Sequence, residues 1–276
     1  MAAPSFFVRG VNAAPLAADT RLRGMTAFEI IFAALMGAVV GSFLNVVIYR
    51  LPRHESLLTP GSHCTSCNAA VKPYDNVPVL AWLWLRGRCR ACRAAISARY
   101  PLVEAATAAL CAGVVLSRSS AGSIALGVLT VLVLVPVALI DLDCHLIPNR
   151  ITGPAALLAV VLGSALDPSG ELNRLIAGAA AGGAFGLAAL VSPRGMGMGD
   201  VKLAAVMGLL LGASVAPALL IALLAGIAIG MVVLARREPG DRRGVGVPFG
   251  PSLALGGLVA LFAGHAMIDA YLHLLG

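Results

Sequence analysis

The sequence predicts an all-α polytopic membrane protein of about eight transmembrane helices, with a long cytoplasmic loop between helices 1 and 2. Three observations support this fold class: composition, the lengths of the apolar segments and the distribution of basic residues. Of the 276 residues, 59% are hydrophobic and 12% are charged, whereas soluble domains carry roughly 25% charged residues. The mean hydropathy of +0.92 agrees with a chain that lies mostly in a bilayer.

Eight apolar segments are candidates for spans, because about 20 helical residues cross a bilayer core. The sixth is the shortest of them. They cover residues 26–49, 100–117, 122–141, 151–167, 173–192, 200–212, 214–235 and 249–273. Residues 1–25 are polar and Ala-rich and lack the apolar run of a secretory signal, so we expect a flexible extension there. In the first helix, Gly41 and Ser42 are small enough for close helix packing, with a direct role in a site as the alternative.

Basic residues favour cytoplasmic loops and therefore predict orientation. Fifteen of the 20 Lys and Arg residues fall on one side of the eight helices, and five, including Arg118 and Arg174, fall on the other side with both termini. We expect both termini outside and the 50–99 loop in the cytoplasm. The net charge of +7 then reflects topology and attraction to anionic membrane lipid, with no nucleic acid as a partner.

Two carboxylates stand at the ends of apolar segments. Asp141 ends the third segment, and Asp200 opens the sixth in the turn Gly197-Met198-Gly199-Asp200. Acidic residues are costly in a bilayer and usually mark chemistry or transport there. The pair indicates a water-activating dyad that cleaves peptides at the membrane surface. A proton or ion relay in a transporter is the alternative, although the two halves show no inverted repeat.

Asp143 competes with Asp141 for the first position of the dyad. Residues two apart on a helix are rotated by roughly 200°, so at most one of the two can face Asp200. Lys202 lies two residues beyond Asp200 and should likewise point elsewhere, as a snorkelling, topology-fixing lysine. Pro248-Phe249-Gly250-Pro251 marks the start of the last helix, and substrate positioning is its alternative role.

The 50–99 loop contains two cysteine pairs, Cys64-x2-Cys67 and, 21 residues later, Cys89-x2-Cys92. Four thiolates complete the closed tetrahedral shell of structural zinc and leave no open position for a catalytic water. Two disulfides or a redox pair are the alternative, but a basic loop facing the reducing cytosol favours metal. Arg93, directly after the last cysteine, would be strained in a left-handed turn.

The chain resembles the bacterial type IV prepilin peptidases, aspartic membrane proteases that commonly double as N-methyltransferases. The resemblance runs from Gly41 to about Gly257. Its matching segments are Gly41-Ser42-Phe43-Leu44-Asn45-Val46, the two Cys pairs, Asn76-Val77-Pro78-Val79-Leu80, Leu85-Arg86-Gly87-Arg88-Cys89, Tyr100-Pro101-Leu102-Val103-Glu104, Asp141 to Asn149, Gly199-Asp200-Val201-Lys202-Leu203 and Pro248-Phe249-Gly250-Pro251.

The resemblance implies cleavage of prepilin and pseudopilin leaders after a glycine, in type IV pilus and type II secretion systems. Methylation of the new N-terminus from S-adenosylmethionine would follow. The family's first catalytic Asp lies six residues before an Ile-Pro pair, here Asp141 before Ile147-Pro148, and the second carries over to Asp200. Asp143 is then a solvated or Arg150-paired charge. A peptidase without methyltransferase activity and a zinc-sensing membrane protein remain as alternatives.

The resemblance also implies a layout and a location. We expect an extension at 1–25, the first transmembrane helix at 26–49, a four-cysteine zinc loop associated with methyl transfer at 50–99 and the peptidase core at 100–276. The site should face the cytoplasm from the bacterial inner membrane. No glycine-rich loop marks the residues that bind S-adenosylmethionine. Three acids near the cytosolic face, Glu55, Asp75 and Glu104, could hold or deprotonate the amine to be methylated.

Overall fold

The computed structural model describes residues 27–192, 196–236 and 248–275, so the expected extension at 1–25 lies outside the described residues. The eight predicted helices are present within a few residues of their expected bounds. They are α2 (Ala27–Arg50), α4 (Arg99–Ser117), α5 (Ala121–Cys144), α6 (Asn149–Leu166), α7 (Pro168–Val191), α8 (Met198–Leu211), α9 (Val215–Ala235) and α10 (Gly250–Leu275). The loop after α2 adds α3 (Leu80–Trp84) and the 3-10 turns η1 (Leu51–Arg53) and η2 (Pro73–Asp75).

The sixth predicted helix, α8, is short, as the sequence suggested. Its 14 residues reach about 21 Å, less than the ~30 Å of a bilayer core. In the described part of the chain, seven segments are long and apolar enough to cross a membrane, and one of them, Met198–Ala235, contains both α8 and α9. The turn η3 (Gly212–Ser214) separates the two helices. The all-helical membrane fold is therefore confirmed, with α8 spanning only part of the bilayer depth.

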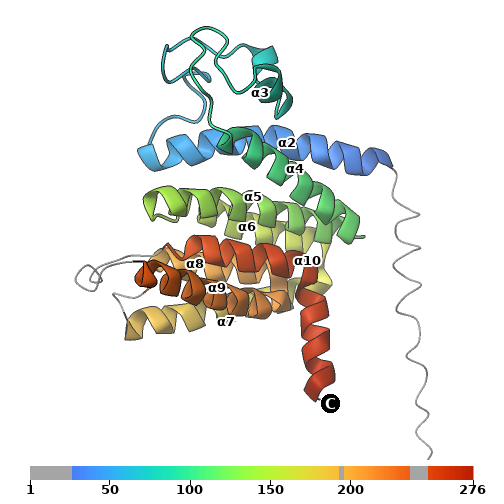
Figure 1. Cartoon of the computed structure of the whole chain (residues 1–276). Coiled ribbons are helices and arrows are strands. Elements are labelled where there is room, and N and C mark those ends of the chain that lie inside the picture. The colour runs from blue at the N-terminus through green and yellow to red at the C-terminus, as the bar shows by residue number, and fades with distance from the viewer. Residues whose placement is uncertain (1–26, 193–195, 237–247, 276) are drawn as a thin grey trace, which may run out of the picture.

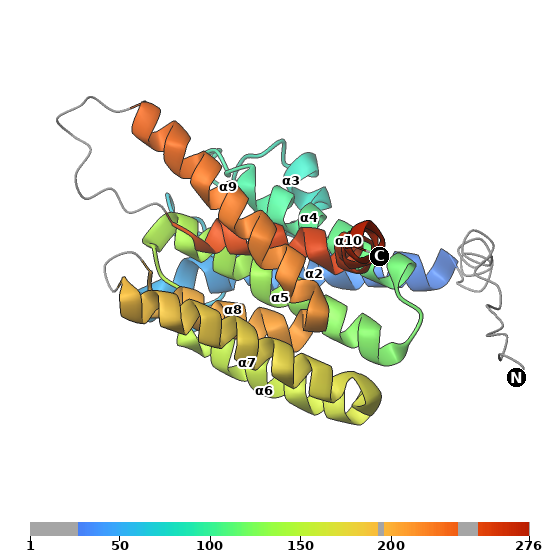
Figure 2. The ribbon, with the colours of Figure 1, turned by 90° about the horizontal axis from the view of Figure 1, so that it is seen from below.

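The helices form stacked layers, with α2 and α4 at one edge, α5 and α6 next, and α7 to α10 beyond them (Figure 1). Seen from below, α6 and α7 lie side by side and α9 crosses α10 diagonally (Figure 2). The main core cluster joins α5, α8 and α10, where Leu134, Met207 and Leu253 are fully buried. The helix that carries Asp141 is thus enclosed by its neighbours.

Small residues allow the backbones to approach closely, as is common between membrane helices. A methyl group added at Gly41 would lie 2.9 Å from Cα of Glu104, which shows that α2 and α4 touch there. Asn45 extends this contact by donating its side-chain N–H to the carbonyl of Tyr100 at 3.1 Å. The packing role expected for Gly41 is therefore confirmed.

The ends of α5, α8 and α10 meet at one end of the bundle. The backbone N–H of Gly250 donates to Asp141 at 2.8 Å, and Lys202 donates to Asn149 at 3.0 Å. A methyl group at Gly199 would lie 2.9 Å from Cβ of Ile147. Segments far apart in sequence are therefore joined by polar contacts at this end.

The connection between α6 and α7 is fixed at the opposite end by Arg174. This residue, expected among the charges on the outer side, lies inside α7, is only 7% exposed and pairs with Asp167 at 2.6 Å and Glu171 at 2.9 Å. The hydrogen bond from Arg174 holds the pKa of Asp167 below its ordinary value. A buried arginine that is paired in this way costs far less than an isolated one.

The contact between α7 and α8 gives a stability prediction. A methyl group at Gly208 would lie 2.5 Å from both the carbonyl oxygen of Ala177 and Cα of Gly178. Because backbone atoms cannot move aside easily, we expect Gly208→Ala to destabilise the protein by about 2 kcal/mol. Thermal unfolding in detergent measures this loss. Gly183→Ala on α7 is the control, since nothing lies within 4 Å of its added methyl; equal melting temperatures for the two variants would contradict the packing argument.

Candidate functional site

The four loop cysteines come together in space. The Sγ atoms of Cys64, Cys67, Cys89 and Cys92 all lie within 4.8 Å of one another, a geometry that could hold a metal ion. Across the two pairs, Cys64 and Cys92 are 3.8 Å apart and Cys67 and Cys89 are 4.0 Å apart. A disulfide needs about 2.05 Å, so the four are free thiols and the disulfide alternative is wrong.

Two equivalent backbone turns build this cluster. The N–H groups of Cys64 and Cys89 donate to the carbonyls of Ala69 and Ala94, five residues ahead in each case. Asn68 and Arg93 both adopt left-handed backbone, with φ of 59° and 62°. Arg93 thus takes the strained conformation that the sequence raised as a difficulty, and the two turns retain matching shapes.

The backbone around the cluster shifts the pKa of the cysteine thiols. Backbone N–H groups of Cys67 and Ser66 donate to the Cys64 thiol and lower its pKa to about 6. Although a backbone hydrogen bond from Ala94 lowers it, hydrogen bonds with the neighbouring thiols raise the pKa of Cys92 to about 11. The thiolate is the form that binds metal.

The rest of the loop supports the cysteine turns. The indole N–H of Trp82 donates to the carbonyl of Ile96 at 3.0 Å, and its ring covers Gly87. At the beginning of the loop, Arg50 is buried and donates to the carbonyls of Ser56 and Gly61. The loop is therefore attached to the end of α2 by a charged side chain as well as by the chain itself.

The three acids considered for the amine have different surroundings. Asp75 forms an ion pair with Arg90 at 2.6 Å, whose hydrogen bonds hold the Asp75 pKa below its ordinary value. Glu104 is 8% exposed and accepts the backbone N–H of Val79 at 2.7 Å. Glu55, by contrast, is exposed to solvent just after η1.

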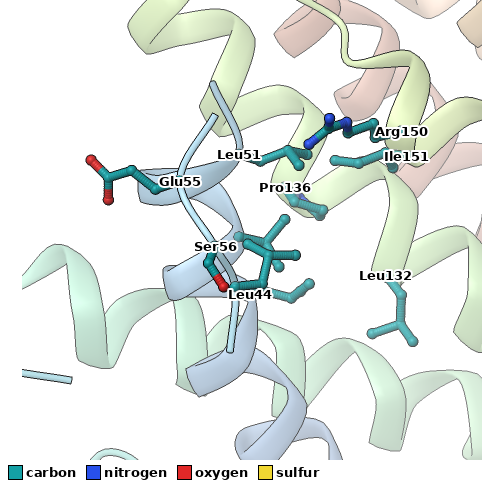
Figure 3. A pocket seen from close by; sticks show the side chains of 10 residues that line it. Leu44, Leu51, Glu55, Ser56, Leu132, Pro136, Arg150 and Ile151 are labelled. Carbon is teal, nitrogen blue, oxygen red and sulfur yellow. The ribbon is translucent and has the colours of Figure 1, made fainter. Parts of the chain in front are cut away.

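Glu55 lies at the rim of a groove of about 430 Å³ between α2, α5 and α6. The groove wall is apolar and Arg150 stands at its mouth, while the Glu55 carboxylate turns away from the wall (Figure 3). The full lining is Leu44, Val47, Leu51, Glu55, Ser56, Leu57, Leu132, Pro136, Arg150 and Ile151.

Asp141 lies in the last turn of α5 and is 6% exposed. Its Oδ2 accepts the N–H of Gly250 at 2.8 Å. Asp200 is half-buried in the first turn of α8, where its Oδ2 accepts the N–H of Gly197 at 3.3 Å. The two carboxylates are close enough to interact electrostatically, so α5 and α8 bring the predicted pair together.

Asp143 is turned toward a different partner. It pairs with Arg99, the first residue of α4, at 2.8 Å, and Arg99 also donates to the carbonyl of Leu139. Asp143 is exposed, as expected, but its charged partner is Arg99 rather than the expected Arg150. Lys202, expected to point elsewhere than Asp200 as a snorkelling lysine, donates to Asn149 at the start of α6.

Sequence reasoning missed the contact of Asp141 with Gly250 and the role of Arg99 beside α5. The sequence indicates a helix start at Pro248 to Pro251. The only signal for a contact with Asp141 is that both segments are expected at the same end of the bundle. Arg99 carried no signal beyond its charge, because the pairing joins residues 44 positions apart.

Two family models match the chain. The Bacterial Peptidase A24 N-terminal domain matches residues 35–118, and the Type IV leader peptidase family matches residues 128–234. A protein of Aeromonas salmonicida (strain A449) named "Prepilin leader peptidase/N-methyltransferase" is 36% identical over 89% of this chain and 94% of its own length.

Two further relatives bear the same name. The protein of Aeromonas hydrophila is 37% identical over 89% of this chain and 93% of its own length. That of Burkholderia pseudomallei (strain 1026b) is 36% identical over 91% of this chain and 90% of its own length. No solved structure matches the chain.

Proposed function

We propose, because this chain belongs to the type IV leader peptidase family of bacterial A24 peptidases, that it cleaves prepilin leaders and methylates the new N-terminus. The resemblance inferred from the sequence is confirmed by these matches. The relatives carry both activities in their names, which favours a peptidase with methyltransferase activity over the transporter, zinc-sensing and cleavage-only alternatives.

The observation that supports the peptidase chemistry best is the approach of Asp141 and Asp200 from two helices at one end of the bundle. We propose these two residues as the catalytic dyad. Two neighbouring carboxylates do not both ionise cheaply, so one retains a proton while the other is charged. The pair titrates as a unit and supplies a base and an acid together.

The charged carboxylate takes a proton from a water molecule, whose oxygen attacks the carbonyl carbon of the leader's last glycine. The protonated carboxyl group donates a hydrogen bond to the carbonyl oxygen. When the C–N bond breaks, the leaving nitrogen receives a proton from the dyad and becomes the new N-terminal amine. Water is thus split between the two products, and no covalent enzyme intermediate forms.

Zinc is the proposed metal of the cysteine cluster, in a structural role. A tetrahedral ion with Zn–S bonds of about 2.3 Å separates its sulfurs by about 3.8 Å, close to the 3.8 and 4.0 Å across the pairs. The four cysteines fill every ligand position, so the ion holds the loop together rather than activating water. Between the two CxxC turns only Ala81 and Gly87 are buried, so the segment has little core of its own and metal binding would supply folding energy.

S-adenosylmethionine is the proposed methyl donor and supplies an electrophilic methyl group when bound. The chain's part is to hold a neutral amine in line with that group, which is mainly a matter of orientation. Glu55 is the proposed candidate among the three acids, since Arg90 engages Asp75 and the backbone of Val79 engages Glu104. Its carboxylate can turn about two side-chain bonds toward a bound amine.

We place residues 50–99 as the cytoplasmic, methyl-transfer-associated loop and 100–276 as the peptidase core, with the site facing the cytoplasm from the inner membrane. The excess of basic residues in that loop supports this orientation. The substrates are then prepilins or pseudopilins that reach the site from the membrane.

Asp141→Asn and Asp200→Asn should each abolish leader cleavage, lowering its rate more than about a hundredfold, because each removes a proton-transfer group. The mass of the substrate's mature N-terminus, after incubation with membranes, measures the reaction. Asp143→Asn is the matched control and should cleave normally, since Asp143 pairs with Arg99. Normal cleavage by either of the first two variants would sink the assignment of the dyad.

Cys64→Ser combined with Cys67→Ser should reduce zinc from about one ion per chain to a small fraction, because two of four ligands are lost. Elemental analysis of the purified protein measures the metal, and limited proteolysis follows the loosening of the loop. Cys144→Ser, an exposed cysteine outside the cluster, should leave both unchanged. An unaltered zinc content in the double variant would refute the four-thiolate site.

Methylation should be separable from cleavage. With labelled S-adenosylmethionine and a peptide that already has the mature N-terminus, Asp141→Asn should transfer label at the wild-type rate, since the dyad acts only in the first reaction. Glu55→Gln should transfer it more slowly and still cleave intact prepilin. An unlabelled product with the wild-type enzyme would remove the second activity.

A further inference from the structure

The start of α10 lies directly against the dyad. The first N–H groups of any helix lack partners within the helix. In α10, Pro251 has no N–H, and the N–H of Gly250 donates to Oδ2 of Asp141 at 2.8 Å in a buried position. One of the unpaired donors of a 26-residue helix is therefore satisfied by a side chain of α5.

Glycine is needed at this position for space rather than for backbone conformation, since Gly250 is not among the residues with positive φ. A methyl group added to Gly250 would lie 2.7 Å from Oδ2 of Asp141 and 3.0 Å from its Cβ and Cγ. Contacts under 3 Å force something to shift, and the group in the way is the carboxyl group itself.

The neighbouring Phe249 fixes where this N–H lies. Its ring lies 6.2 Å from that of Phe185 on α7, centre to centre. On the side of α9, a methyl group at Gly226 would lie 2.7 Å from the same ring. Phe249 is thereby wedged between two helices, and its carbonyl accepts the N–H of Leu253 to begin α10. The donor at Gly250 is held by packing and does not adjust freely to Asp141.

We propose that Gly250 is a positioning residue of the dyad, whose N–H sets the rotation of the Asp141 carboxyl group. The inference rests on the proposed peptidase function of Asp141 and Asp200. A carboxyl group is planar, so fixing Oδ2 also fixes Oδ1. Because Oδ2 accepts the N–H of Gly250, Oδ1 is the oxygen of Asp141 that this donor leaves available to the proposed dyad.

Gly250→Ala tests the proposal by steady-state cleavage of a prepilin. The added methyl group turns the Asp141 carboxyl group out of position, and a misplacement of about 1 Å costs roughly a hundredfold in rate. We expect kcat to fall about tenfold to a hundredfold with little change in KM, because substrate binding does not use this contact.

Gly257→Ala is the matched control on the same helix. Its methyl group would lie 2.6 Å from Cδ1 of Leu134, so it is equally crowded but meets the movable end of a side chain about two turns along α5 from Asp141. It should retain wild-type kcat. The zinc content of Gly250→Ala and its methylation of a pre-cleaved peptide should also equal those of the wild type, since both depend on the fold and neither on the dyad.

A wild-type kcat for Gly250→Ala overturns the proposal. A loss of methylation together with cleavage also overturns it, because the variant's defect is then in folding and not in the position of the Asp141 carboxyl group. An equal fall in kcat for Gly257→Ala overturns it as well, because crowding anywhere on α10 would then have the same effect. Failure of the underlying function has a different signature: Asp141→Asn would itself cleave normally, whatever Gly250→Ala does.

Discussion

The contact between Asp141 and the first N–H of α10 is the constraint on which the end of the bundle depends. It joins residues 109 positions apart and requires the C-terminus of α5 to meet the N-terminus of α10. Asp200 must approach the same place from α8, so three helix ends converge. A carboxylate in an apolar protein needs donors, and helix N-termini supply them without adding further charge.

Close approach of helix backbones makes that convergence possible. Between membrane helices the hydrophobic effect offers little drive for association, so contact area and small residues matter more. Gly199 lies against Ile147, Gly208 against the backbone of α7 and Gly41 against that of α4. The shortness of α8 has a use in this arrangement, because its start can reach Asp141 while its other end turns back through η3 within the bundle.

Most of the architecture could be predicted from the sequence because its causes are local. Apolar segment length predicted eight helices, and the CxxC spacing predicted the cysteine cluster, since each turn is closed by neighbours in the chain. The contacts that set side-chain partners are not local. Asp143 pairs with Arg99, Glu104 holds Val79, and Asp141 meets Gly250; which of several nearby charges or donors is used depends on helix rotation and depth, which composition and spacing do not specify.

The junction of α2 and α4 has a consequence for the entropy of the chain. Their close contact at Gly41 requires the whole stretch between Arg50 and Arg99 to be closed into a loop, and the cost of closure grows with loop length. Arg50 shortens this loop at its base by holding Ser56 and Gly61. A metal ion that joins the two cysteine turns would divide the same loop into shorter segments at a second point. The cysteine cluster would then act on a helix pair that it does not touch, by reducing the number of conformations that the connection loses when α2 and α4 meet.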